Sequence, residues 1–318
     1  MAGTSAHVPV LYEEVLARLE PRPGGRYIDA TVGGGGHATG ILNASNPDGR
    51  LLAVDTDPEA IAFAEQVLEP FGDRVTLQVA DFRYLRAVAL ACGFDRVDGI
   101  LMDLGLSSRQ LADAERGFSF SQDGPLDMRM NRRQGQNAAD LVNHLTEAEL
   151  ADLLWCYGEE RSARRIARAI VAARPVTTTG QLAGLVERAV RRREKIHPAT
   201  RTFQALRIAV NDELEALSQA LLQARDLLRP GGRLAVIAFH SLEDRLVKRF
   251  YQQEMRDCVC PPEMPVCVCQ HRATMTVLTP KAVRPGNEEI ARNPRSRSAR
   301  LRIAERLVES PAGTDVAL

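Results

Sequence analysis

The chain has 318 residues, of which 45% are hydrophobic and 26% charged, and its formal net charge is zero. This length and composition are typical of a globular protein of about two domains. No stretch approaches the roughly 18 apolar residues of a membrane span, and the N-terminus has no basic segment followed by an apolar one. We therefore expect a cytoplasmic protein that does not contact a membrane.

The first third of the chain alternates between apolar runs and helical patterns. A helix is expected at residues 12–19, and strands are expected at residues 27–32, 51–57, 75–82 and 99–105 with helices between them. That alternation predicts a parallel, doubly wound α/β sheet.

Four consecutive glycines, Gly33 to Gly36, stand between the first strand and the next helix. Glycine tolerates positive φ and leaves its N–H accessible, and the helix adds partial positive charge, so this loop suits an anion. A nucleotide phosphate, a dinucleotide pyrophosphate and the carboxylate of S-adenosylmethionine all fit, and a plain surface turn is the alternative. The absence of Gly-Lys-Ser/Thr sets aside a P-loop. The pattern Gly33-x-Gly35-x-x-Ala38, with Asp55 further on, also fits a dinucleotide site.

An acid stands at or just after the end of each of the first four strands: Asp29, Asp55, Asp81 and Asp103. Ligands of open α/β sheets bind at the carboxyl ends of the strands. We therefore expect the four acids and the glycine loop to ring one crevice.

A long, mostly helical pattern follows Gly105. We divide the chain into a sheet domain whose first part is residues 1–110, a helical insertion at 111–209, and the second part of the sheet domain at 210–318. Residues 161–207 hold eleven arginines and one lysine against two glutamates, a local net charge of +10. A solvated basic face is the alternative, but the repeated bias favours contact with RNA or DNA.

One helix of the insertion has a two-faced pattern. Its arginines fall on one face: Arg161, Arg164, Arg165 and Arg168. Its apolar residues fall on the other: Ala163, Ile166 and Ile170. This spacing predicts an amphipathic helix with a basic outer face.

Strand character returns at residues 233–239 and then in TMTVLTP and SARLRIAERL. The last two have no crossover helix between them, so we expect them to pair antiparallel. A terminal antiparallel hairpin after five parallel strands is the plan of class I methyltransferases and differs from that of the usual dehydrogenase. The glycine loop is therefore better matched to S-adenosylmethionine.

Six cysteines do not make a disulfide scaffold in a chain of this length. Cys92 and Cys156 stand in apolar helical patterns and are expected in the core. The other four are crowded into CVCPPEMPVCVCQH: Cys258, Cys260, Cys267 and Cys269. Paired thiolates could hold structural zinc, but C-x-C is less usual than C-x-x-C, so we expect reduced thiols in a flexible loop and no catalytic metal.

The chain resembles the MraW family, the ribosomal RNA small-subunit methyltransferase H family. The matching blocks run from His7 to Arg306 and include YIDATVGGGGH, GFSFSQDGPLDMRM, HPATRTFQALRI and NPRSRSARLRIAER. The resemblance implies a class I S-adenosylmethionine-dependent methyltransferase with an inserted all-helical domain. It implies methylation of the exocyclic N4 of a cytidine in 16S rRNA, cytosine 1402 in the usual small-subunit numbering, with 16S rRNA or the small ribosomal subunit as partner. The oligomeric state stays open, a homodimer included.

The resemblance also implies a set of cofactor contacts: Gly35, Gly36, His37, Asp55, Phe82, Asp103 and Gln110. The chemistry of these residues agrees with such roles. The glycines and the His37 amide can hold a carboxylate, and Asp55 can accept both ribose hydroxyls. Phe82 either stacks on adenine or fills the core.

The amino group of cytosine is a poor nucleophile because its lone pair is delocalised into the ring, so the enzyme needs an acceptor for its N–H. Asp103 is the candidate catalytic acceptor. It stands within DLGL, where many amino-directed methyltransferases have Asp/Asn-Pro-Pro-aromatic, so a backbone carbonyl or Asp103 itself must substitute. We place Arg201 and His240 among the substrate-binding residues. Ser241 and Asp244 after His240 either contact substrate or cap the next helix.

Three other functions also fit parts of the sequence. One is a methyltransferase that acts on a protein or a small molecule, which the concentrated arginines disfavour. A dehydrogenase accounts for the glycines and Asp55 but leaves Asp103 and the basic insertion unexplained. A non-catalytic RNA-binding ribosome-assembly factor with a retained cofactor fold accounts for the basic insertion.

Overall fold

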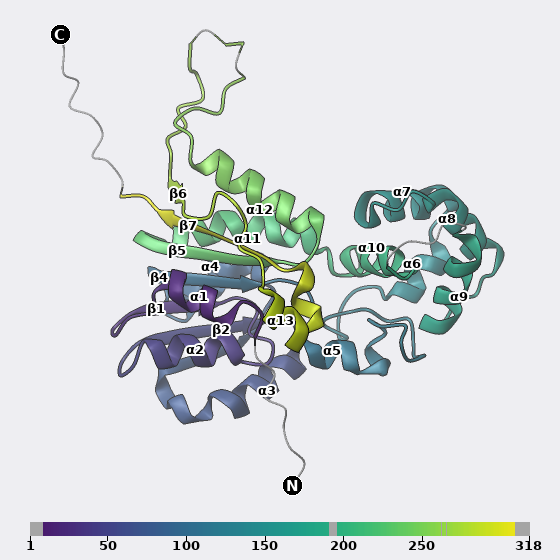
Figure 1. The fold of residues 1–318 in the computed structure, drawn as a ribbon, viewed down its shortest axis with the longest axis horizontal. Helices are drawn as coiled ribbons and strands as arrows, with labels where there is room; N and C mark the ends of the chain where they lie inside the picture. Colours follow the sequence, from purple (N-terminus) through teal and green to yellow (C-terminus); the bar gives the residue numbers. More distant parts are fainter. Residues whose placement is uncertain (1–8, 191–195, 262, 265, 309–318) are drawn as a thin grey trace. The chain divides into compact units, whose positions relative to one another are not determined.

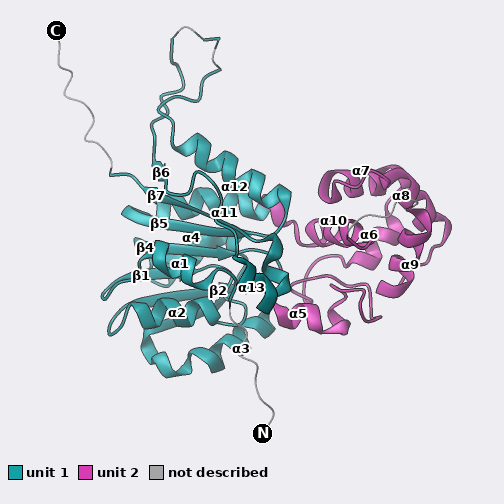
Figure 2. Cartoon of the chain, viewed as in Figure 1, with its two compact units in different colours: residues 1–105, 216–318 teal, residues 106–215 magenta. Residues whose placement is uncertain are grey.

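The structure, a computed structural model, describes residues 9–190, 196–261, 263–264 and 266–308. His7, where the matching blocks begin, and the basic run at 191–195 lie outside these ranges. The chain divides into two compact units, unit 1 at residues 1–105 and 216–318 and unit 2 at residues 106–215 (Figure 2).

Unit 1 is built on one seven-stranded sheet with the order β3-β2-β1-β4-β5-β7-β6 (Figure 1). The strands are β1 (Arg26–Asp29), β2 (Arg50–Asp55), β3 (Val75–Val79), β4 (Val97–Asp103), β5 (Leu228–Ala238), β6 (Met275–Val277) and β7 (Arg300–Arg306). The first five are parallel, whereas β7 is antiparallel to both of its neighbours, β5 and β6. This arrangement confirms the class I methyltransferase sheet and differs from the all-parallel dehydrogenase plan.

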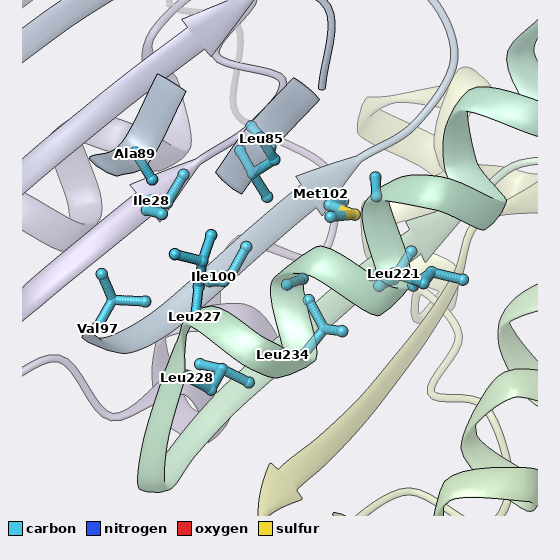
Figure 3. Packing of buried hydrophobic residues seen from close by; sticks show 14 of the residues in the cluster. Ile28, Leu85, Ala89, Val97, Ile100, Met102, Leu221, Leu227, Leu228 and Leu234 are labelled. Atoms are coloured by element: carbon cyan, nitrogen blue, oxygen red, sulfur yellow. The ribbon is translucent and has the colours of Figure 1, made fainter. Parts of the chain in front are cut away.

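Among the described residues, seven helices accompany this sheet: α1 (Tyr12–Leu19), α2 (Gly36–Ala44), α3 (Pro58–Leu68), α4 (Leu85–Ala91), α11 (Glu213–Leu227), α12 (Ser241–Glu254) and α13 (Asn287–Arg292). The first residues of α11, up to Glu215, fall in unit 2. Consecutive residues of a strand point to opposite faces of the sheet, and both faces are buried here. Ile28 and Ile100 pack with α4, α11 and α12 (Figure 3). Tyr27 and Leu101 pack with α1, α2 and α3 on the other face. The sheet, with the carboxyl ends of its parallel strands, is thus held between two apolar layers.

Unit 2 is mostly helical and has a core of its own. Its helices are α5 (Ser108–Ala112), α6 (Ala138–His144), α7 (Glu147–Gly158), α8 (Ala163–Ala172), α9 (Thr179–Ala189) and α10 (Thr200–Asn211). Leu150, Ile166 and Leu206 are fully buried in its core cluster. Among the described helices of both units, none is long and apolar enough to cross a membrane.

Unit 2 spans residues 106–215, whereas 111–209 was expected, and at its C-terminal end side chains just past 209 bind inside this unit. The Asn211 side chain donates to the Met128 carbonyl at 2.8 Å and accepts the Met130 N–H at 2.8 Å. Arg207 donates to both carboxylate oxygens of Glu213, each at 2.8 Å. These polar contacts keep the end of α10 with the helical unit.

Candidate cofactor and methyl-transfer site

The glycine loop joins β1 to α2 in a conformation that suits glycine. Gly33 and Gly35 have φ of 48° and 77°, in the left-handed region that side chains disfavour. A Cβ on Gly36 would lie 2.4 Å from Cγ of Pro9, closer than atoms can pack. Helix α2 begins at Gly36 without a side-chain cap on its first turn. Free N–H groups at a positive helix end are suited to an anion.

Asp55 at the end of β2 fixes this loop to the sheet. One of its carboxylate oxygens accepts the Gly33 N–H at 2.9 Å, and the other accepts the Asp57 N–H at 2.9 Å. Each carboxylate oxygen has a second lone pair, so Asp55 can also accept hydroxyl groups. The predicted ribose acceptor therefore also holds the loop.

Asp29 at the end of β1 is a buried acid that is 1% exposed. Loss of hydration on burial raises its pKa to about 7, the nearby Asp55 charge adds to the rise, and the Thr31 N–H partly offsets it. The carboxyl ends of β1 and β2 thus place two acids close enough to affect each other's charge.

Asp103 ends β4, and a hydrogen bond from its backbone N–H holds it in place. Its N–H donates to Thr31 Oγ1 at 2.6 Å, and its Oδ2 lies 3.6 Å from His37 Nε2. Its buried Oδ1 has no hydrogen-bond partner among the described residues. Since a buried carboxylate oxygen without a partner is costly, this oxygen is the natural contact for a ligand.

The charge of Asp103 is disfavoured by its surroundings. Burial raises its pKa well above the usual range, and the nearby acids Asp29 and Glu243 raise it further. Its side chain keeps 25% exposure, so solvent tempers the rise. Glu243 was missed in the sequence because it lies on α12, far along the chain from Asp103.

The other expected site residues of unit 1 have local partners. Phe82 is half-buried in the 3-10 turn η2 (Phe82–Tyr84) and packs against the α4 side of the core. Asp81 caps this turn and pairs with Arg83 at 2.9 Å. Its carboxylate thus has a structural role in the turn itself.

The start of α12 is capped by His240, which corrects the expected cap at Ser241 or Asp244. His240 Nδ1 accepts the Glu243 N–H at 3.4 Å, and Glu243 Oε2 accepts the His240 N–H at 3.3 Å. Asp244 instead binds Arg300 at 2.7 Å and Arg302 at 2.6 Å on β7, which lowers the pKa of its carboxyl. The arginines that pair with Asp244 come from a strand far along the chain, so the sequence around Asp244 could not reveal this pairing.

Two expected site residues belong to unit 2. Gln110 is 8% exposed, and its side-chain oxygen accepts the Ser107 N–H at 2.9 Å in the capping box of α5. Arg201 on α10 lies 4.0 Å from Glu160. Both residues therefore have contacts inside their own unit.

Helix α8 is amphipathic, which confirms the predicted helix face. Its apolar side chains are buried, namely Ala163, Ile166, Ala167 and Ile170. Its arginines are exposed, together with Arg161 just before it: Arg164, Arg165 and Arg168. Of these, Arg168 pairs with Glu147 at 3.3 Å, and Arg165 donates to Ser162 at 3.2 Å.

The family model of the MraW methylase family matches residues 4–307. The chain belongs to this family. Membership of a methylase family agrees with the antiparallel β7. It rules out the dehydrogenase alternative, whose sheet has a different strand arrangement.

The methylase is similar in sequence to several named proteins over nearly its whole length. One from Thermomicrobium roseum is 59% identical over 308 residues, which are 96% of this chain and 94% of the relative. Relatives from Symbiobacterium thermophilum and Geobacter sulfurreducens are each 53% identical and cover 95% and 96% of this chain, and 96% and 100% of their own lengths. All three are named ribosomal RNA small subunit methyltransferase H.

The cysteines of this methylase correct one expectation. All six lie in the described ranges, and each is a free thiol. Cys92 packs half-buried against the core of unit 1, whereas Cys156 is exposed on α7 and is not a core residue. The apolar pattern around Cys156 was misleading because α7 also exposes its neighbour Trp155.

Proposed function

We propose that the methylase transfers the methyl group of S-adenosylmethionine to the exocyclic N4 of a cytidine in 16S rRNA, cytosine 1402 in the usual small-subunit numbering. The observation that carries the proposal is Asp103, a recessed acid at the end of β4 whose Oδ1 has no partner among the described residues. The substrate is supported by the names of relatives that share most of their length with this chain.

The glycine loop and Asp55 fit the cofactor. The uncapped first turn of α2 would hold the methionyl carboxylate through the amides of Gly35, Gly36 and His37. Asp55 would accept the ribose hydroxyls through its remaining lone pairs, and Phe82 would contact adenine with its exposed side. When bound, S-adenosylmethionine supplies an electrophilic methyl group on sulfur. The resemblance to the family adds Gln110 as a further cofactor contact.

Asp103 would act on the nucleophile. Its Oδ1 would accept a hydrogen bond from the cytosine N4–H, and this bond raises the electron density on the nitrogen. As positive charge develops on the nitrogen, Oδ1 would then take the proton. The acceptor must be deprotonated, so the raised pKa of Asp103 sets the pH below which transfer slows. His37, whose Nε2 is 3.6 Å from Asp103, keeps the carboxylate turned toward the site.

The exposed arginines of α8 would bind RNA through its phosphates. Cytosine N4 can be reached only when the base is unpaired or turned out of its helix, so flanking phosphates must be held while the base enters the site. Arg201 and His240 would be further RNA contacts, and both already have a protein partner that orients them.

The test is methylation of RNA by the purified protein. Labelled S-adenosylmethionine is supplied with unmodified small ribosomal subunits and, separately, with free 16S rRNA, and the modified nucleoside is identified by mass spectrometry. N4-methylated cytidine at one position supports the proposal. Cofactor binding without label in either RNA would favour the assembly-factor alternative, and label in another nucleoside would overturn the assigned target.

A further inference from the structure

The segment between α12 and β6 carries the four crowded cysteines away from the sheet. Figure 1 shows this segment extending beyond the end of α12. It contains no helix or strand in its described residues, and its apolar side chains face solvent, with Val266 69% and Val268 66% exposed. A loop of this length without a core of its own is uncommon in a compact domain. Some other interaction must therefore order it.

The base of the segment is firmly anchored. The Thr274 N–H donates to the Glu254 carbonyl at 2.7 Å, and the Ala273 N–H donates to Asp257 at 3.2 Å. Glu254 is 1% exposed and pairs with Arg225 at 3.0 Å. Both ends of the excursion are thus fixed to unit 1, and only its distal part needs an ordering contact.

The four thiols of the distal part lie together. The sulfur atoms of Cys258, Cys260, Cys267 and Cys269 are all within 4.8 Å of one another. Cys267 Sγ lies 3.6 Å from Cys269 Sγ, which in turn lies 3.8 Å from Cys258 Sγ. These separations exceed the roughly 2.05 Å of a disulfide. They match the edge of about 3.8 Å in a tetrahedron of sulfurs placed about 2.3 Å from a central zinc ion.

The backbone around these thiols is also arranged for thiolates. The Val259 N–H donates to Cys269 Sγ and the Cys260 N–H donates to Cys258 Sγ, each at 3.4 Å. Such N–H donors stabilise negative sulfur in metal sites. His271 Nε2 lies 3.1 Å from the Gln253 carbonyl, so this nitrogen is turned toward α12 and away from the thiols.

We propose that Cys258, Cys260, Cys267 and Cys269 bind one zinc ion as a tetrathiolate that orders the segment between α12 and β6. The four thiols release their protons to solvent as the zinc–sulfur bonds form. The site closes the distal loop through its two C-x-C pairs, and no position is left open for water. Its role is therefore structural, and it lies on a different part of unit 1 from the strand-end acids.

The test measures metal content, thiol access and local order on the full chain. Protein made with zinc in the medium is dialysed and analysed for zinc and iron, and we expect about one zinc ion per chain. A thiol reagent should modify the exposed Cys156 at once and the four clustered thiols only after a chelator is added. Hydrogen exchange at residues 257–273 should speed up with the chelator, while exchange in β4 and β5 stays unchanged.

Two variants make the assignment specific. Cys267→Ser/Cys269→Ser should lose at least nine tenths of the zinc, and the matched control Cys92→Ser/Cys156→Ser should keep it. The unfolding temperature of the sheet should stay the same in both variants, which separates loss of the metal from loss of the fold. Iron in place of zinc, a mass lowered by four hydrogens as for two disulfides, or equal reactivity of all six thiols would each overturn the proposal.

Discussion

Asp103 is the residue on which the proposed chemistry depends. Its carboxylate can accept the N4 proton only when deprotonated, and burial beside Asp29 and Glu243 raises its pKa well above the usual range. We expect kcat at saturating cofactor to rise with pH through that raised pKa, and Asp103→Ala to lower kcat by roughly 10²-fold. Rapid-quench measurement of labelled RNA across pH checks both effects.

The matched control for Asp103→Ala is Asp81→Ala, which removes an acid that follows β3 and pairs with Arg83. It should keep the pH profile of kcat. Full turnover of Asp103→Ala would assign the proton acceptor to another group.

Asp29 lowers the stability of the fold at neutral pH. Its pKa is raised from 3.8 to about 7 by burial. The unfolded chain therefore releases this proton first, and stability falls as pH rises between those two values. Asp29→Asn cannot ionise and still offers an oxygen to the Thr31 N–H. We expect it to raise the free energy of unfolding by roughly 1–3 kcal/mol at pH 8 and by less at pH 5.

Urea unfolding at the two pH values measures this difference. The exposed Asp73→Asn is the control, and it should change stability little at either pH. An Asp29→Asn gain of equal size at pH 5 and pH 8 would contradict the assigned cause.

At the scale of elements, the proposed cofactor site in the loop between β1 and α2 can be tested by adding a single methyl group to one of its glycines. A Cβ on Gly36 would meet Pro9 at 2.4 Å, whereas a Cβ on Gly34 has its nearest neighbour, Phe63, at 4.0 Å. We expect Gly36→Ala to weaken S-adenosylmethionine binding at least about tenfold, or ~1.4 kcal/mol, and Gly34→Ala to bind nearly as the parent does. Calorimetric titration gives both constants, and equal effects would show that the Pro9 contact is irrelevant.

Helix α8 is the element that we expect to bind phosphates. Arg164→Glu/Arg165→Glu reverses two exposed charges without touching the buried face. RNA affinity should fall by roughly 10-fold or more at low salt. The slope of log affinity against log salt concentration should become shallower, as expected for about two fewer counterions released on binding. The same reversal at the exposed residues of α12, Lys248→Glu/Arg249→Glu, is the control, and an equal loss there would point to a general charge effect.

The sequence predicted the elements whose signals are local. Alternating apolar runs located β1 to β5, and spacing alone identified the buried and exposed faces of α8. β1 and β3 end earlier than expected, at Asp29 and Val79, although the Ala30 and Ala80 N–H groups just past them still donate to carbonyls of β4 and β2.

Contacts across the chain were beyond such reasoning. The influence of Glu243 on Asp103, the Thr31 hydroxyl that accepts the Asp103 N–H, and the arginines of β7 that bind Asp244 join residues far apart in sequence. The cysteines show the same limit. Their C-x-C spacing argued against a metal, whereas the distances between sulfur atoms argue for one.

At the scale of the whole molecule, unit 1 is made of two separated stretches of chain and unit 2 of one. Strand β7 pairs with both β5 and β6. A chain that ends at Arg292 lacks β7 and leaves both strands with an unpaired edge, which favours aggregation. We expect hydrogen exchange in β4 and β5 of this chain to approach that of an unfolded protein.

The amides of unit 2 are the internal reference in that experiment. Their protection should persist because the core of unit 2 uses only residues 106–215. Equal loss of protection in both units would show that they unfold as one cooperative block.

The place of β7 after unit 2 in the sequence also sets an order of events during synthesis. Residues 106–215 emerge from the translating ribosome as one uninterrupted stretch and can fold before β7 is made. The sheet must wait, since the strand that separates β5 from β6 leaves the exit tunnel only after all of unit 2 has emerged. A nascent chain therefore acquires its arginine-bearing helices well before it can complete the strand arrangement that characterises a methylase.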